Sequence, residues 1–102
     1  MALTVTVTEF KPVDRNSLKG FATARIAELQ LSIADVAVHQ RDGTRWAALP
    51  SKPYIKDGTL VIGEKGKPTY LQVFTWDSRP VADAFSSAVW LALDNFREAR
   101  AA

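Results

Sequence analysis

The residues of this chain best suited to chemistry are cations interleaved with aromatic side chains in its middle third. Residues 41–79 hold seven basic and four acidic groups, a net charge of +3 in a chain whose overall net charge is +2. Basic groups among aromatic rings are typical of surfaces that track a phosphate backbone and stack bases. A solvated loop has the same composition. The candidate contacts, with one arginine added from an earlier segment, are Arg25, Arg45, Lys52, Tyr54, Lys56, Lys65 and Lys67.

Catalytic groups are sparse. The single histidine, His39, shares a strand side with Asp35, but no serine stands in a nucleophile-elbow context that would make it a general base. Residues 63–67 lack the spacing and the following helix of a Walker A phosphate loop. The chain has no cysteine, and no His/Asp/Glu cluster suits a metal ion. We therefore expect no enzyme, no metal, no cofactor and no small-molecule substrate.

The elements that must position these residues begin with an antiparallel sheet. Alternating apolar and polar residues predict strands, while the run of turn-forming residues over 11–19 predicts a loop. The apolar phase of the third strand changes near Ala34-Asp35, which predicts a β-bulge. Asp42-Gly43 is a hairpin signal. The predicted strands cover residues 3–8, 20–26, 29–39 and 45–49.

Pro50 and Pro53 cannot donate ladder hydrogen bonds, so regular pairing should stop there. Two turn-like clusters within residues 56–74 predict a hairpin arm. The period then becomes helical over about 78–99. We expect one α+β domain over residues 1–102, in which an antiparallel sheet of four to six strands, over about 3–76, is followed by one long C-terminal helix.

The helix should cover one face of the sheet. The opposite face would carry Thr4, Thr6 and Thr8, with Thr23 and Arg25 beside them, as a solvated surface or a binding platform. Trp46 is expected in the core, because strand tryptophans are usually buried. Trp90 and Leu91 lie off the main apolar stripe, so the helix predicts a dimer interface at these two residues.

The stretch that ordinary packing does not explain follows the fourth strand, at Trp46-Ala47-Ala48-Leu49-Pro50-Ser51-Lys52-Pro53. With the runs 19–26 and 31–38 before it, this segment resembles the stage V sporulation protein G family of bacterial septation regulators. The resemblance covers roughly residues 3–53 in order, and the late helix stands where the family has one. Residues 54–76 depart from it, because they are longer and lack the family's His-Pro pair.

The resemblance implies a small homodimer that binds DNA or RNA as a regulator. The alternative is a protein-interaction module that docks a partner through the Pro-Ser-Lys-Pro-Tyr loop or a sheet edge and binds no nucleic acid. No apolar run approaches the ~20 residues of a membrane span, and the first ten residues do not read as a signal peptide. We expect a cytoplasmic protein with no membrane contact.

Overall fold

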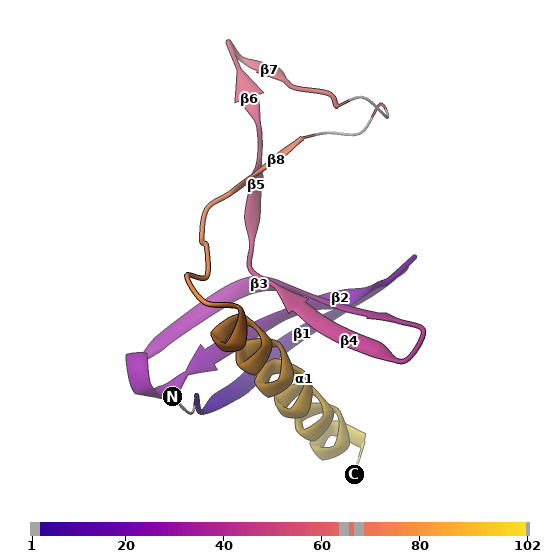
Figure 1. Cartoon of the computed structure of the whole chain (residues 1–102). Helices are drawn as coiled ribbons and strands as arrows, with labels where there is room; N and C mark the ends of the chain where they lie inside the picture. The colour runs from indigo at the N-terminus through magenta and orange to yellow at the C-terminus, as the bar shows by residue number, and fades with distance from the viewer. Residues whose placement is uncertain (1–2, 64–65, 67–68, 102) are drawn as a thin grey trace.

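Four strands form one antiparallel sheet in the order β1-β2-β3-β4, and a single helix covers one of its faces (Figure 1). The computed structural model describes residues 3–63, 66 and 69–101. A short 3₁₀ turn, η1 (Ala27–Leu29), joins the second and third strands. The strands are β1 (Val5–Arg15), β2 (Leu18–Ile26), β3 (Leu31–Arg41) and β4 (Thr44–Ala48). The predicted α+β class, with a sheet before a C-terminal helix, is confirmed.

The first strand is longer than the sequence predicts. The predicted loop over 11–19 is wrong, because β1 continues to Arg15 and pairs with β2 up to the Arg15–Leu18 pair. The chain reverses at Asn16, whose φ of 55° lies in the left-handed region that asparagine tolerates. Pro12 is accommodated because β1 is an edge strand, where a residue without an N–H group costs no ladder hydrogen bond.

The predicted β-bulge in the third strand is confirmed. The register of β2 against β3 shifts between the Ala22–Val36 pair and the Ala24–Ile33 pair. Asp35 lies between them with a φ of 58°. The extra residue switches which side chains of β3 face the helix, and this explains the change of apolar phase in the sequence.

The helix α1 (Arg79–Ala101) packs on the face of the sheet that carries the small residues of β2. Ala22 and Ala24 are almost completely buried, and they leave room for the large side chains that the helix brings. The buried core consists of Val7, Ala22, Ala24, Ile26, Val36, Val38, Phe85, Val89, Trp90, Ala92 and Leu93. Among the described residues, no helix combines the length and the apolar character that crossing a membrane requires.

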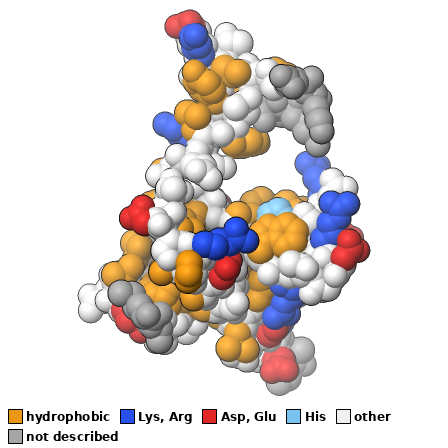
Figure 2. All heavy atoms as spheres, viewed as in Figure 1, with side chains coloured by type: hydrophobic (Ala, Val, Ile, Leu, Met, Phe, Trp, Pro, Cys, Tyr) orange, Lys and Arg blue, Asp and Glu red, His pale blue; other side chains and the backbone are white. Residues whose placement is uncertain are grey.

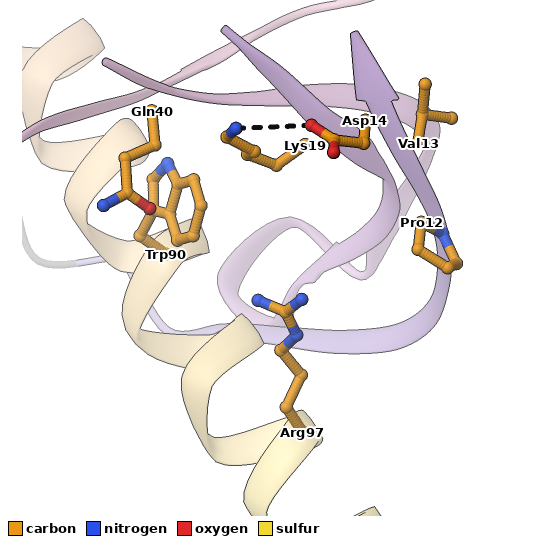
Figure 3. Close-up of a pocket in the computed structure, with 7 residues that line it drawn as sticks. All are labelled: Pro12, Val13, Asp14, Lys19, Gln40, Trp90 and Arg97. Atoms are coloured by element: carbon orange, nitrogen blue, oxygen red, sulfur yellow. Dashed lines mark ion pairs between the residues drawn. The ribbon is translucent and has the colours of Figure 1, made fainter. Parts of the chain in front are cut away.

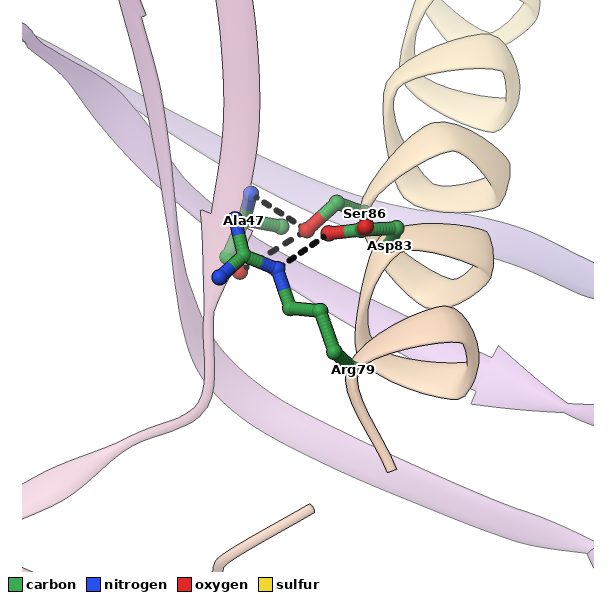
Figure 4. Close-up of polar contacts among 4 residues, drawn as sticks. All are labelled: Ala47, Arg79, Asp83 and Ser86. Atoms are coloured by element: carbon green, nitrogen blue, oxygen red, sulfur yellow. Dashed lines mark hydrogen bonds and ion pairs between the residues drawn. The ribbon is translucent and has the colours of Figure 1, made fainter. Parts of the chain in front are cut away.

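Helix side chains also occupy backbone groups of the edge strand β4 (Figure 4). The Ser86 hydroxyl accepts a hydrogen bond from the Ala47 N–H at 3.0 Å and donates one to the Ala47 carbonyl at 3.1 Å. The Trp90 indole N–H donates to the Trp46 carbonyl at 2.9 Å. At the start of the helix, Arg79 pairs with Asp83 at 3.1 Å, and both side chains are exposed. The two bonds to Ala47 occupy backbone groups on the free side of β4 and so hinder strand addition at this residue.

Between β4 and α1 the chain leaves the sheet as a narrow arm (residues 51–63, 66 and 69–74 where described) (Figure 1). At its base β5 (Ser51–Pro53) pairs with β8 (Tyr70–Gln72), and farther out β6 (Ile55–Lys56) pairs with β7 (Thr59–Leu60). Backbone hydrogen bonds at Tyr54, Val61 and Thr69 join the two pairs. In Figure 1 the helix lies below the sheet and the arm rises above it. The predicted arm is present, and its pairing starts earlier, at Ser51.

The Ser86 contact gives a stability prediction. Ser86→Ala leaves both backbone groups of Ala47 without these partners, and it should lower the free energy of unfolding by about 1–3 kcal/mol. Ser87→Ala is the matched control, because Ser87 is exposed on the same helix turn and should change stability by less than about 0.5 kcal/mol. Urea denaturation followed by circular dichroism measures both, and equal effects would contradict the role of Ser86.

Candidate functional site

The face of the sheet opposite α1, called here the open face, holds an aromatic hollow. Residues paired across antiparallel strands share a face, and the pairs Phe21–Ala37 and His39–Trp46 lie on this one. The hollow has a volume of about 710 Å³ and extends to the base of the arm, where Tyr70 completes its wall. Figure 2 shows the histidine, in pale blue, among hydrophobic side chains below the arm.

His39, which lines this hollow, is stacked in parallel on the ring of Trp46. The ring centroids of His39 and Trp46 are 5.1 Å apart, with an angle of 4° between the planes. A hydrogen bond of 3.0 Å joins the Ser17 hydroxyl to Nδ1 of His39 and fixes the imidazole from its other side. Partial burial lowers the pKa of His39, because burial disfavours the charged form. Partial burial thus favours the neutral ring, which lies flat on its neighbour.

Trp46 corrects one prediction. The sequence places it in the core, whereas the structure places its half-buried ring on the open face, stacked on His39. The reason is the register of β4, which turns the neighbouring Ala47 toward Ser86 of the helix. The small Ala47 side chain therefore lies on the helix side of β4, and the large Trp46 side chain lies on the open face.

Three cations share the open face with the hollow. By register, Lys11 lies across from Phe21, Arg25 across from Ser32, and Arg41 across from Thr44. All three side chains are exposed. Two carboxylates, Glu9 and Asp35, share this side, and Asp35 lines the hollow itself. The positive charge is thus spread around the aromatic rings rather than concentrated at one point.

The predicted contact residues do not form a single surface. Arg25 lies on the open face, where the sequence places it. Arg45 points to the helix side, where its guanidinium is 3.1 Å from an Asp94 carboxylate oxygen and lies 4.5 Å from the centre of the Trp90 ring. Its phosphate contact stays a prediction, and a phosphate would have to compete with Asp94 for the guanidinium.

The remaining predicted contacts belong to the arm. Lys52 and Lys56 are exposed on β5 and β6, and Tyr54 is half-buried between these strands. Lys65 and Lys67 lie outside the described residues. The stretch that the sequence singles out thus leads from β4 into the base of the arm, and its residues Ala48 to Ser51 line the hollow.

The predicted dimer interface on the helix is also corrected in part. The Trp90 side chain is only 3% exposed, because it packs in the core of its own chain and donates to the Trp46 carbonyl. Leu91 is 62% exposed and points away from the sheet. Trp90 therefore offers no surface to a second copy.

A second cavity lies on the helix side, between the β1–β2 hairpin and the C-terminal half of α1 (Figure 3). It has a volume of about 540 Å³, and Trp90 forms part of its wall. Its two cations have partners within the chain: Lys19 lies 3.6 Å from Asp14, and the Arg97 guanidinium lies 5.0 Å from the centre of the Phe10 ring. This cavity offers an anion less uncommitted charge than the open face does.

Sequence reasoning missed Phe21 and Tyr70. Phe21 lies out of phase with the buried alanines of β2, and this alternation is the signal that assigns it to the open face. Tyr70 carries no such signal in the sequence, because it reaches the hollow only through the pairing of β5 with β8. Within the described ranges no group of three or more His, Asp or Glu side chains is placed to hold a metal ion.

Comparisons with models of protein families, with curated proteins and with solved structures find no match for this chain.

The partly buried His39 predicts a pH dependence. Because the pKa of His39 is lower in the folded chain than the ordinary value of 6.5, the unfolded chain takes up the proton first as the pH falls. The stability that this group contributes is present above about pH 6.5 and is lost as the pH falls toward the folded-state pKa. His39→Gln, which keeps a polar partner for Ser17, should flatten the decline in the free energy of unfolding between about pH 8 and pH 5.

Urea titrations at several pH values measure this difference. Hydrogen bonds from the side chain and backbone of Thr4 lower the pKa of Glu28 below its ordinary 4.5, so this carboxylate titrates below the chosen window. An unchanged slope in His39→Gln would contradict the assignment to His39.

Proposed function

We propose that the protein binds single-stranded nucleic acid on the open face of the sheet. The observation that carries the proposal is the set of aromatic rings around the hollow, with His39 and Trp46 stacked 5.1 Å apart and Phe21 and Tyr70 beside them. Proteins that bind single strands present aromatic rings on which bases stack, and they surround these rings with cations that follow the phosphates. The open face combines both features.

Unpaired bases fit this surface better than a duplex. In a duplex the flat faces of the bases are stacked on one another, so they are not free to contact protein rings. The hollow, at about 710 Å³, is large enough for unstacked bases. Arg25 and Arg41 stand toward opposite ends of β3 by register, and so phosphates on both sides of the hollow have a cation within reach.

The resemblance to septation regulators agrees with this proposal. It implies a small homodimeric regulator that binds DNA or RNA, and the order of elements through β4 follows the segments on which the resemblance depends. The phosphate contacts that we propose differ from those predicted by sequence, because Arg45 is paired with Asp94 and the arm lysines stand outside the hollow.

A charge-reversal experiment tests the phosphate contacts. Arg25→Glu/Arg41→Glu should weaken binding of a labelled single-stranded oligonucleotide at least tenfold in fluorescence anisotropy. The wild-type affinity should fall with salt, by about 0.7 logarithmic units per tenfold increase in salt for each phosphate contacted, and the variant should show a shallower slope. Arg100→Glu is the control, since it removes the same kind of charge from the end of the helix.

The same assay with DNA, RNA and duplex distinguishes the ligand classes. Lys52→Glu/Lys56→Glu tests the arm separately and should weaken binding less than the open-face variant. Absence of salt-sensitive binding by the wild type at low salt would overturn the proposal.

Stacking gives an independent prediction. Tyr70→Ala removes a ring that is 58% exposed and lies outside the buried core, so the fold should be unaffected. Loss of one base–aromatic stack costs about 1–3 kcal/mol, which corresponds to roughly 5- to 150-fold weaker binding in the same assay. Tyr70→Phe should restore the affinity. If Tyr70→Ala binds like the wild type, the hollow is not the base-binding site.

A further inference from the structure

The largest set of exposed apolar side chains lies on the arm rather than on the sheet or the helix. Six residues of the arm with aliphatic or aromatic side chains are 39–60% exposed. Single exposed apolar residues are ordinary on protein surfaces, but a contiguous group on one projecting element marks an interaction site. The six residues are Ile55, Leu60, Ile62, Leu71, Val73 and Phe74.

The arm has no hydrophobic core of its own. In the described part of the chain β8 pairs only with β5, and β6 only with β7, as two separate two-stranded ladders. A two-stranded ribbon is at best marginally stable in water without a third strand or another packing surface. The arm therefore needs a partner that covers its apolar side chains.

The segment that contains β8 and leads from the arm back to the helix also lacks the usual protection of a sheet edge. Residues 69–76 contain no charged residue, no proline and no glycine, and five of the eight are apolar or aromatic. Natural edge strands carry lysines, prolines or bulges that prevent pairing with another chain. An unprotected strand of this composition is suited to pairing.

We propose that the arm is a dimerisation element, and that residues 71–75 pair with the same segment of a second copy, with Val73 opposite its own counterpart. Antiparallel pairing of two identical strands has two-fold symmetry, so each strand supplies hydrogen-bond partners for the backbone groups of the other. Because the same surface is used on both copies, the assembly stops at a dimer. The resulting interface would join two arms into a four-stranded ribbon and cover both sets of apolar side chains. This proposal stands independently of nucleic-acid binding.

The apolar area fits a second copy. From their exposed fractions, the six side chains present on the order of 500 Å² of apolar surface, and a standard interface buries about 800 Å² per partner with about 60% of it apolar. The arm alone thus supplies the apolar area that a stable dimer requires. By contrast, Leu91 stands between buried residues on the helix as a single exposed leucine.

A second copy is also the one partner that is present whenever this chain is folded. Because these apolar side chains are exposed on every copy, a ligand that is bound only some of the time would leave most of them in contact with water.

Sedimentation equilibrium of the full chain tests the proposal. The wild type should be a dimer at micromolar concentration, and Val73→Glu/Phe74→Glu should raise the dissociation constant roughly a hundredfold or more, because it places like charges at the centre of the interface. Leu91→Glu is the matched control and should remain dimeric. Circular dichroism checks that the helix and sheet persist, as expected since neither arm residue belongs to the core.

Cross-linking tests the contact even if the double variant fails to fold. The chain has no cysteine, so Val73→Cys introduces one thiol, which should give a disulfide-linked dimer under mild oxidation at low protein concentration. Leu91→Cys should stay uncross-linked. A monomeric wild type, a dimer disrupted by Leu91→Glu but not by the arm variant, or equal cross-linking at both positions would overturn the proposal.

Discussion

The contact between α1 and the alanine-rich side of β2 is the interaction on which the rest of the structure depends. Ala22 and Ala24 keep that side of the sheet shallow, so Phe85 and Leu93 of the helix can be completely buried against it. The helix thus supplies the large side chains where β2 carries alanines, while Ile26 and Val38 of the sheet complete the core. On the opposite face of the sheet, Phe21 and Trp46 remain partly exposed.

Sequence periodicity predicts the parts of the fold that depend on one buried face. The alternation in β2, the bulge at Asp35 and the stripe of α1 are all recovered, since each reflects contact with the same core. Periodicity does not predict the end of β1, because Pro12 and the polar residues after it have the composition of a turn. An edge strand tolerates that composition, and position within the sheet cannot be known before the strands are paired.

The two misplaced tryptophans show where pattern reasoning stops for the site. Trp46 has alanines after it and an arginine before it, so neither phase of β4 is clearly apolar, and only the contact of Ala47 with Ser86 settles its direction. Trp90 follows Val89 at the margin of the apolar stripe, and its indole reaches the core because a backbone carbonyl of β4 accepts its N–H. Charged residues are equally hard to assign to a face from sequence, because Arg25 and Arg45 are both strand arginines and yet lie on opposite faces of the sheet.

The arm enters and leaves the body of the protein at one place. A small cavity of about 320 Å³ is lined on one side by Leu49 and Pro50 and on the other by Thr75 and Trp76, so the two feet of the arm are neighbours. Trp76 then contacts Phe85 in the core, with ring centroids 5.1 Å apart, and anchors the returning chain. The arm thus leaves and rejoins the body at one place, so a change in its length would not by itself move the path from β4 into α1.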